Sequence, residues 1–552
     1  MGHDYRYILA LGVALSFGCR VENAEVQRGL NAINVTDMAQ KIQVLAADSM
    51  EGRAPSSAGE EKTVTYLVDQ FRRLGLRSGS GEDYVQPVPL VSIAAGRNMT
   101  LAVQGKGKVT NLAYGDQFVA FTSRVAERVG MQNSELVFVG YGIVAPEYGW
   151  NDFDGVDVKG KTIVVLVNDP GFVTSDTTLF KGRSMTYYGR WTYKYEEAAR
   201  QGAAAVLIVH ETEPAGYPWE VVTGSWAGTR FVLDSGEDKL PSAAVEGWVT
   251  ADVARQLFRD GGLDYDSLKT RAAQRVFRAV PLGLRASLTV RNTLRRSSSR
   301  NVLAVLPGTT RPDEYVIYMA HWDHLGRDTT LPGDQIYNGA LDNASGVAGL
   351  LELAKAFAAL DRNPARSVLF LAVTAEEQGL LGSQYYATHP VYPLNKTVAA
   401  INLDGMNIFG PMRDITVVGH GNSELDDYVA EAAKGQNRVV RPDPEPEKGF
   451  YFRSDHFSLA KVGVPALDPD GGTNSVEHGE AWTRQQRDAY TAQRYHKPAD
   501  EYDPSWDLGG ALEDLRLFFR VGYRLANEDT FPNWRPGSEF KAARDAMMAG
   551  GR

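Results

Sequence analysis

The chain has 552 residues, of which 43% are apolar and 23% are charged, and its formal net charge is −10. This length predicts two or more domains with packed cores. The acidic balance argues against nucleic acid as a main partner, because phosphate binding requires a basic face. The densest basic run, "RNTLRRSSSRN" at residues 291–301, is interpreted as a solvated loop between two strands.

The N-terminal segment has the features of an export signal. Ile8 to Phe17 form an apolar run of signal-peptide length, too short to span a membrane. Gly18 and Cys19 follow, and Cys19 is the only cysteine in the chain. We therefore expect residues 1–19 to be a signal peptide and the protein to be exported, whether periplasmic, secreted or lipid-anchored. The arrangement resembles a bacterial lipoprotein signal, in which such a cysteine takes the lipid.

Two helices are predicted after this segment. Residues 35–50 and 60–76 carry apolar side chains at helical spacing. The stretch "EGRAPSSAGE" between them, at residues 51–60, is rich in Ser, Gly and Pro and is expected to be a loop. We assign residues 20–105 to the first part of a domain that resumes later in the chain.

The residue pattern changes between about residues 106 and 285. Short β-rich runs appear there, such as "KTIVVLVND" and "AAAVLIVH", and glycine turns separate them. One helical piece, "YKYEEAARQG", precedes the second of these runs. We expect residues 106–285 to form a separate β-rich module inserted into the first domain.

Strands and helices alternate in the rest of the chain, which we assign to the main part of the first domain, residues 286–552. The runs "NVLAVLPG", "EYVIYMAH", "RSVLFLAVT" and "TVAAINLDG" are compact, apolar and rich in Val and Ile. Residues 345–360 form an apolar helix among them, and residues 509–529 form an amphipathic one. This alternation predicts an α/β fold with a mainly parallel, mixed sheet flanked by helices.

Potential metal ligands stand where three of these strands end. One strand ends at His321, another runs to Glu376 and Glu377, and a third ends at Asp404. Because open α/β sheets bind ligands at the carboxyl ends of their strands, we expect these side chains to share one edge. The loop before the 345–360 helix adds Asp342. Imidazole and carboxylate are the ligands that zinc takes at catalytic sites.

Simpler interpretations exist for each residue taken alone. A single acid at a strand end usually faces water, and Asp342 with Asn343 could be a helix N-cap. The adjacent glutamates favour a divided role, because consecutive residues that leave a strand point in different directions. We assign Glu377 to metal and Glu376 to the transfer of a proton, although spacing alone does not fix which is which.

Five motifs together resemble the co-catalytic di-zinc metallopeptidase family of secreted bacterial aminopeptidases. They are "HWDH", "NGALDNASG", "TAEEQGLLGS", "NLDG" and "YHKPADEYD", and they occur in the family's order between residues 298 and about 530. Glutamate carboxypeptidases and glutaminyl cyclases are relatives of this family. The β-rich module resembles a protease-associated domain, through "KGKTIVVLVND" and "AARQGAAAVLIVH".

The resemblance implies two zinc ions that share one aspartate. Asp342 matches the bridging ligand, and His321 and Asp404 match the other ligands of one zinc. Glu377 and His496 match the ligands of the second zinc, with His478 as the competitor for the histidine position.

The resemblance also implies roles around the metals. Glu376 matches the general base, and Asp323 matches an aspartate that orients His321. A cis peptide bond is implied after Asp342. We do not expect His324 to be a ligand. The "RSDHF" stretch at residues 453–457 recurs in the family near the substrate pocket, where its role is either binding or structural.

The implied activity is hydrolysis of peptide substrates by a zinc metallopeptidase, most simply as an aminopeptidase. One alternative is a carboxypeptidase of the glutamate type, for which Arg453 or Arg327 would grip a substrate carboxylate. A glutaminyl cyclase, which binds a single zinc, is another. A non-catalytic binding protein is the third, and the presence of every ligand position argues against it.

Overall fold

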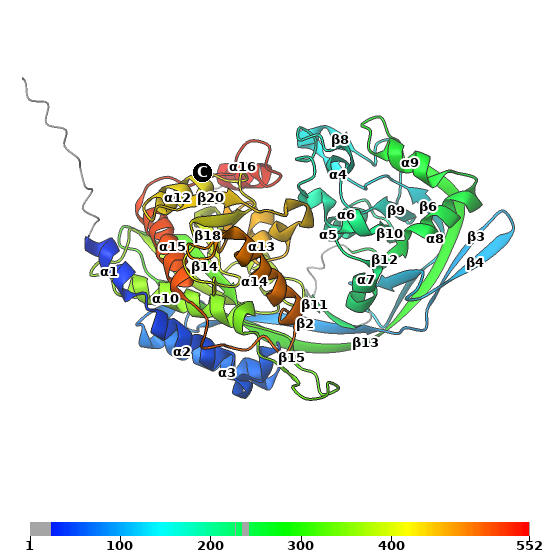
Figure 1. Ribbon diagram of the computed structural model, residues 1–552. Helices are drawn as coiled ribbons and strands as arrows, with labels where there is room; N and C mark the ends of the chain where they lie inside the picture. The colour runs from blue at the N-terminus through cyan, green and yellow to red at the C-terminus, as the bar shows by residue number, and fades with distance from the viewer. Residues whose placement is uncertain (1–23, 227, 235–241, 551–552) are drawn as a thin grey trace, which may run out of the picture.

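The computed structural model describes residues 24–226, 228–234 and 242–550. The predicted signal peptide, with Cys19, lies outside the described residues. Within them, no helix combines the length and the apolar character needed to cross a membrane. Figure 1 shows two units side by side, joined along one edge by the long strand β13 (Val280–Leu306) and by β2 (Val85–Ala95).

The first unit contains the predicted mainly parallel sheet. Its strand β14 (Arg311–His321) runs parallel to β17 (Arg366–Val373) and to β18 (Thr397–Asn402), and β18 runs parallel to β21 (Ala466–Asp470). The end of β13 pairs antiparallel with β17, which makes the sheet mixed. The α/β prediction is therefore confirmed, with all four predicted strands in place.

Helices cover both faces of this sheet. Alternate side chains of β14 point to opposite faces, so Tyr318 packs in the core beside α10 (Gly346–Ala358) and α15 (Gly509–Asn527). Ile317 and Met319 pack on the other face with side chains of α11 (Leu381–Thr388) and α13 (His456–Lys461). The other helices of this unit are α1 (Ala24–Ala32), α2 (Val35–Leu45), α3 (Ala58–Arg73), α12 (Leu425–Lys434), α14 (Gly479–Gln493) and α16 (Lys541–Gly550).

The second unit has its own sheet and its own core. Strands β6 (Arg128–Phe138), β9 (Thr162–Leu166), β10 (Ala205–His210) and β12 (Val245–Thr250) pair in that order and run parallel. Strand β5 (Phe118–Phe121) pairs antiparallel with β12, and β3 (Thr100–Gly105) pairs with β4 (Lys108–Ala113). Its helices include α4 (Pro170–Thr174), α5 (Trp191–Arg200), α6 (Thr212–Ala215), α7 (Trp219–Trp226), α8 (Ala251–Gly261) and α9 (Tyr265–Ala272).

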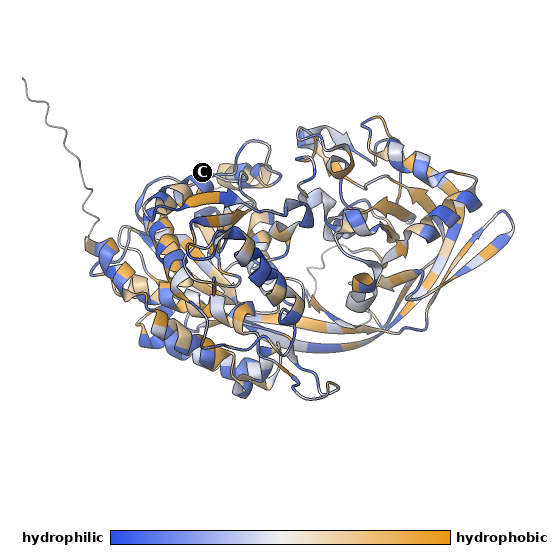
Figure 2. Cartoon of the chain, viewed as in Figure 1, coloured by the Kyte–Doolittle hydropathy of each residue, from blue (hydrophilic) through white to orange (hydrophobic). Residues whose placement is uncertain are grey.

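One prediction about the connection between the units is wrong. Residues 291–301, expected to be a loop, lie inside β13, where they pair with β2. The first part of β13 instead pairs with β6 and β3 of the second sheet. The basic and serine residues are tolerated because this ribbon between the two cores is exposed over much of its length. Figure 2 shows the alternation of polar and apolar residues along it.

Both predicted module boundaries fall within strands, β3 and β13. The predicted boundary at residue 105 falls at the end of β3, whose partners all lie in the second sheet. The boundary at 285 falls within β13, which belongs to both sheets. The local sequence of such a strand does not indicate the residue at which it leaves one sheet and joins the other.

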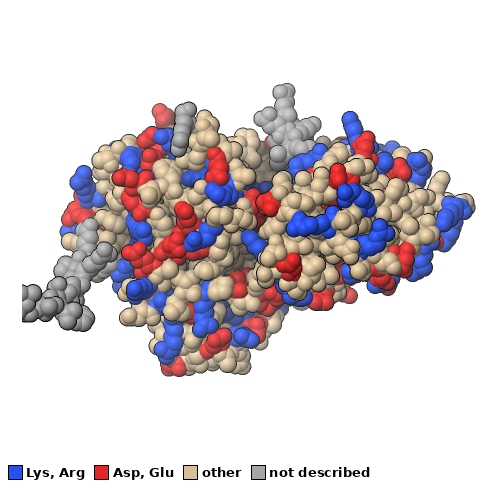
Figure 3. All heavy atoms as spheres, turned by 90° about the horizontal axis from the view of Figure 1, so that it is seen from above, with Lys and Arg blue, Asp and Glu red and all other residues tan. Residues whose placement is uncertain are grey.

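The two units also touch away from the ribbon. The ammonium of Lys461 lies 2.6 Å from Glu196 of α5, and Met185 donates its backbone N–H to the carbonyl of Pro446 at 3.1 Å. Tyr187 packs against Phe457, with ring centroids 5.0 Å apart. Seen from above, basic and acidic side chains are interspersed over both units (Figure 3).

Candidate metal centre

The ends of three parallel strands bring the predicted side chains to one edge of the first sheet. His321 is the last residue of β14, Glu376 and Glu377 follow the end of β17, and Asp404 follows β18. All of them lie at the carboxyl ends of the strands, where α/β sheets bind ligands. Asp342 approaches the same edge from the irregular turn Ala340–Ser345, which leads into α10.

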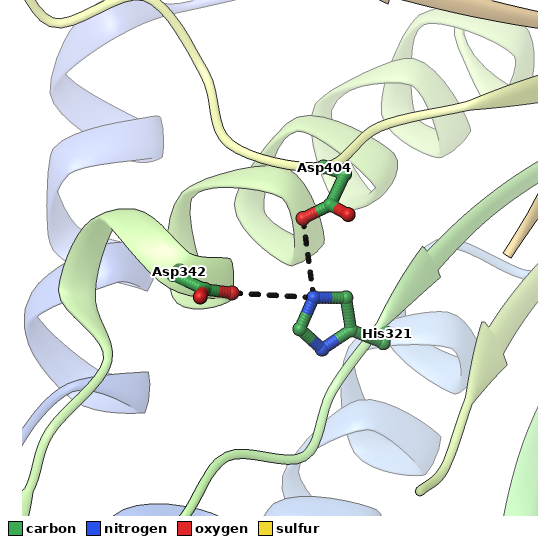
Figure 4. Close-up of side chains that lie close together, drawn as sticks. All are labelled: His321, Asp342 and Asp404. Atoms are coloured by element: carbon green, nitrogen blue, oxygen red, sulfur yellow. Dashed lines mark hydrogen bonds and ion pairs between the residues drawn. The ribbon is translucent and has the colours of Figure 1, made fainter. Parts of the chain in front are cut away.

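The two carboxylate oxygens of Asp342 face different histidines. Its Oδ1 lies 3.3 Å from Nε2 of His321, and its Oδ2 lies 3.1 Å from Nε2 of His496. Nε2 of His321 is also 3.2 Å from Oδ1 of Asp404, so His321, Asp342 and Asp404 form one group (Figure 4). Asp342 therefore stands between two sets of ligands.

The second set is completed by a residue from the far end of the sequence. His496 follows α14, and its Nε2 lies 3.1 Å from Oε2 of Glu377 as well as close to Asp342. His478, the competitor, instead stacks on Trp482 at the start of α14, with ring centroids 4.4 Å apart. The structure thus brings His496, and not His478, to the centre.

These separations fit two tetrahedral metal sites. Two atoms bound to one zinc at about 2.0–2.1 Å lie about 3.3 Å apart in tetrahedral geometry. The distances from His321 to Asp342 and Asp404, and from His496 to Asp342 and Glu377, are 3.1 to 3.3 Å.

Glu376 is placed beside the ligands without joining either set. Its Oε2 lies 4.0 Å from Nε2 of His321. Burial raises the pKa of Glu376 well above its usual value, and the charges of Glu377, Asp404 and Asp455 raise it further. So many buried carboxylates repel one another unless positive charge is added, which divalent cations would supply.

Comparison with known proteins agrees with this geometry. Residues 301–519 match the model of peptidase family M28. The matched segment runs from the end of β13 into α15 and contains the candidate ligands His321, Asp342, Glu377, Asp404 and His496.

Curated relatives match this chain over part of their own length. Mouse aminopeptidase NAALADL1 is 33% identical over 159 residues, which cover 28% of this chain and 19% of the mouse protein. A glutamate carboxypeptidase 2 homolog of Caenorhabditis elegans is 30% identical over 198 residues, covering 34% of this chain and 24% of that protein. The matched segments thus span less than a quarter of these relatives.

A solved structure matches more of the chain at lower identity. The aminopeptidase from Aneurinibacillus sp. strain AM-1 is 20% identical, with a TM-score of 0.48, and the match covers 92% of this chain and 97% of that one.

Asp323 contacts His321 in a way that differs from the prediction. Its carboxylate lies 3.9 Å from Nδ1 of His321, too far for a hydrogen bond, and the carbonyl of Asp323 lies 3.2 Å from that nitrogen instead. The carboxylate accepts the backbone N–H groups of Glu376 at 3.1 Å and Glu377 at 3.4 Å. Asp323 therefore orients the two glutamates with its side chain and His321 with its backbone. Burial raises the pKa of Asp323 to about 7.

The turn that carries Asp342 is fixed at both ends. Asp500, four residues after His496, accepts the backbone N–H groups of Leu341 at 3.2 Å and Asp342 at 3.1 Å. The side-chain oxygen of Asn343 accepts the N–H of Gly405 at 3.0 Å, which ties this turn to the loop of Asp404. The Asp342–Asn343 bond is cis, as the resemblance implied.

The "RSDHF" stretch supports Asp404. The hydroxyl of Ser454 donates to Oδ2 of Asp404 at 2.6 Å and accepts from the amide of Asn402 at 2.7 Å. This contact leaves Oδ1 of Asp404 facing His321. Ser454 therefore has an orienting role at the site.

Sequence reasoning missed two residues of the site. Arg53 ends the 3-10 helix Asp48–Arg53, so the predicted loop at residues 51–60 is partly helical. Arg53 is 1% exposed and donates to the carbonyls of Trp322 and Gly339, both at 2.9 Å. His324 is fully buried, and its Nδ1 lies 2.6 Å from Oε1 of Glu377. Two features of the sequence could have pointed to these residues: His324 is the second histidine of "HWDH", and Arg53 lies among small residues. Neither feature is specific for a functional site.

Proposed function

We propose that the protein is a zinc-dependent exopeptidase, most simply an aminopeptidase that binds two zinc ions. The observation that carries the proposal is the position of Asp342, whose two oxygens face His321 and His496. His321 and Asp404 would complete one zinc site, and Glu377 and His496 the other. The match to peptidase family M28 supports peptide bonds as the substrate.

The residues around this centre suit peptide hydrolysis. When bound, zinc supplies a nucleophile at neutral pH and stabilises negative charge on the scissile carbonyl oxygen. Glu376 would accept the proton of the attacking water and return it to the departing amine. Asp323 would hold Glu376 and Glu377 in place through their backbone N–H groups.

A second candidate is a carboxypeptidase that grips a substrate carboxylate, and two arginines favour it. Arg190, from the second unit, is 8% exposed, and its Nε has no hydrogen-bond partner within the part of the chain that the structure describes. Burial and the charge of Arg453 lower the pKa of Arg190 to about 10. Burial also lowers the pKa of Arg453. A substrate carboxylate bound beside Arg190 and Arg453 would neutralise their two neighbouring positive charges.

One experiment separates these candidates. The protein is dialysed against chelator and reloaded with zinc, and its metal content is measured beside activity on three dipeptide sets: free, N-blocked and C-amidated. An aminopeptidase would hold two zinc ions and require the free amine, whereas a carboxypeptidase would require the free carboxylate. One zinc per chain with release of a cyclised N-terminal residue would indicate a glutaminyl cyclase. Failure to cleave any dipeptide when loaded would contradict the proposal.

We also propose that the protein is exported and that its second unit is a protease-associated domain. Export rests on the apolar run from Ile8 to Phe17, and lipidation on Cys19 directly after it. If Cys19 carries a lipid, Cys19→Ser should move the protein from the membrane fraction to the soluble fraction. An unchanged distribution would exclude this anchor.

A further inference from the structure

A buried histidine outside the predicted ligand set contacts the metal centre. His324 is fully buried directly behind Glu377, and its Nδ1 lies 2.6 Å from Oε1 of that glutamate. The other oxygen of Glu377, Oε2, lies 3.1 Å from Nε2 of His496. The two oxygens of one carboxylate therefore face two different imidazoles.

The distances assign different tasks to the two histidines. Ligands of one tetrahedral zinc stand about 3.3 Å apart, as His496 and Oε2 of Glu377 nearly do. A separation of 2.6 Å is shorter than the spacing of two ligands of one ion and lies just below the range of about 2.7–2.9 Å for charge-assisted N–H···O hydrogen bonds. We therefore interpret the contact between His324 and Glu377 as a hydrogen bond. His324, Asp342 and Glu377 also lie close enough together to hold an ion, and the test below separates this alternative.

The surroundings of the ring fix this hydrogen bond. Gly339 leaves the space for the imidazole, because a Cβ built there would stand 2.6 Å from Cδ2 of His324. The backbone N–H of His324 donates to the carbonyl of Arg53 at 3.3 Å. Nε2 of His324 is buried and has no hydrogen-bond partner among the described residues, so Nδ1 is the ring nitrogen that contacts a partner.

We propose that His324 is a positioning residue for the second zinc site, a proposal that rests on the proposed function. Its Nδ1–H would donate a hydrogen bond to Oε1 of Glu377, which leaves only Oε2 free to bind the metal. Glu377 would thereby bind the metal through one oxygen, because the hydrogen bond fixes the orientation of its carboxylate group. Hydrogen-bond partners of metal ligands typically change metal affinity about 10–100-fold when removed.

The test is to titrate zinc into the metal-free protein and to measure the heat of binding by calorimetry. This measurement does not depend on peptide cleavage. His324→Leu removes the donor, and His324→Asn keeps an N–H near the position of Nδ1. We expect His324→Leu to weaken one of the two zinc affinities about 10–100-fold and His324→Asn to restore most of the loss. The unchanged affinity of the site formed by His321 and Asp404 serves as the internal control for folding.

Other outcomes would overturn the proposal. Equal affinities in the parent and in His324→Leu would show that the hydrogen bond has no effect on the metal. A loss of affinity in His324→Asn as large as that in His324→Leu would mean that the ring itself is required. X-ray absorption of the loaded protein would then count the imidazoles: two at one metal would make His324 a ligand. A parent protein that binds no zinc would instead refute the proposed function.

Discussion

The two glutamates that follow β17 have different surroundings, although they are neighbours in the sequence. Glu377 is held between His324 and His496, whereas Glu376 lies 4.0 Å from His321 and has no side-chain hydrogen bond among the described contacts. This difference supports the assignment of Glu377 to metal and Glu376 to proton transfer. The structure shows which side chain faces the ligands, which spacing alone left open.

Glu376→Gln tests that assignment at the residue scale. The amide keeps the size of the side chain but cannot accept a proton, so turnover should fall about 10²–10⁴-fold. Zinc content, measured on the purified variant by elemental analysis, should stay that of the parent, because Glu376 belongs to neither ligand set. Parent-like turnover would remove Glu376 as the base, and loss of metal would make it a ligand.

At the scale of elements, the 3-10 helix Asp48–Arg53 before α3 connects the loops of the candidate metal centre. The guanidinium of Arg53 donates to the carbonyl of Trp322, between His321 and Asp323, and to the carbonyls of Asn338 and Gly339 that precede the Asp342 turn. It also donates to Leu45 at the end of α2 at 2.6 Å. Burial lowers the pKa of Arg53 to about 10, and nearby carboxylates oppose this effect.

Arg53→Met should therefore loosen both ligand sets at once. It leaves several buried carbonyls without a donor, and we expect the free energy of unfolding to fall by at least about 3 kcal/mol. Thermal unfolding of the metal-free protein measures this loss. Arg53→Lys, which keeps the charge but not the planar set of donors, should recover only part of it. A melting temperature equal to that of the parent in Arg53→Met would contradict the role of Arg53.

At the scale of the whole molecule, the second unit has buried ionisable groups far from the metal centre. Glu246, on β12, is 6% exposed and accepts a hydrogen bond from Ser123 at 2.6 Å. Burial raises its pKa to about 7, although Ser123, Arg230 and Arg124 act in the opposite direction and Glu196 adds to the shift. The folded unit thus binds a proton that the unfolded chain releases above about pH 4.5.

This difference predicts a loss of stability as the pH rises. Between about pH 4.5 and 7 the folded state holds more protons than the unfolded one, so the free energy of unfolding falls, by about 3 kcal/mol for this group. Glu246→Gln should be as stable as the parent at pH 5 and more stable at pH 8, by thermal unfolding. Glu220→Gln, an exposed glutamate of the same unit, is the matched control. A parent and a Glu246 variant with the same pH profile would contradict the prediction.

The sequence by itself predicted the α/β fold, the family resemblance and most of the candidate ligands. Apolar runs predict buried strands from local sequence, and these strands end at or next to His321, Glu377 and Asp404. Because the carboxyl ends of parallel strands lie at one edge of the sheet, these side chains come together there. The tertiary structure decided which late histidine reaches Asp342 and which contact Asp323 makes. It also revealed the continuity of β13 and the roles of Arg53 and His324. These features depend on partners far away in the chain, and local patterns do not encode such partners.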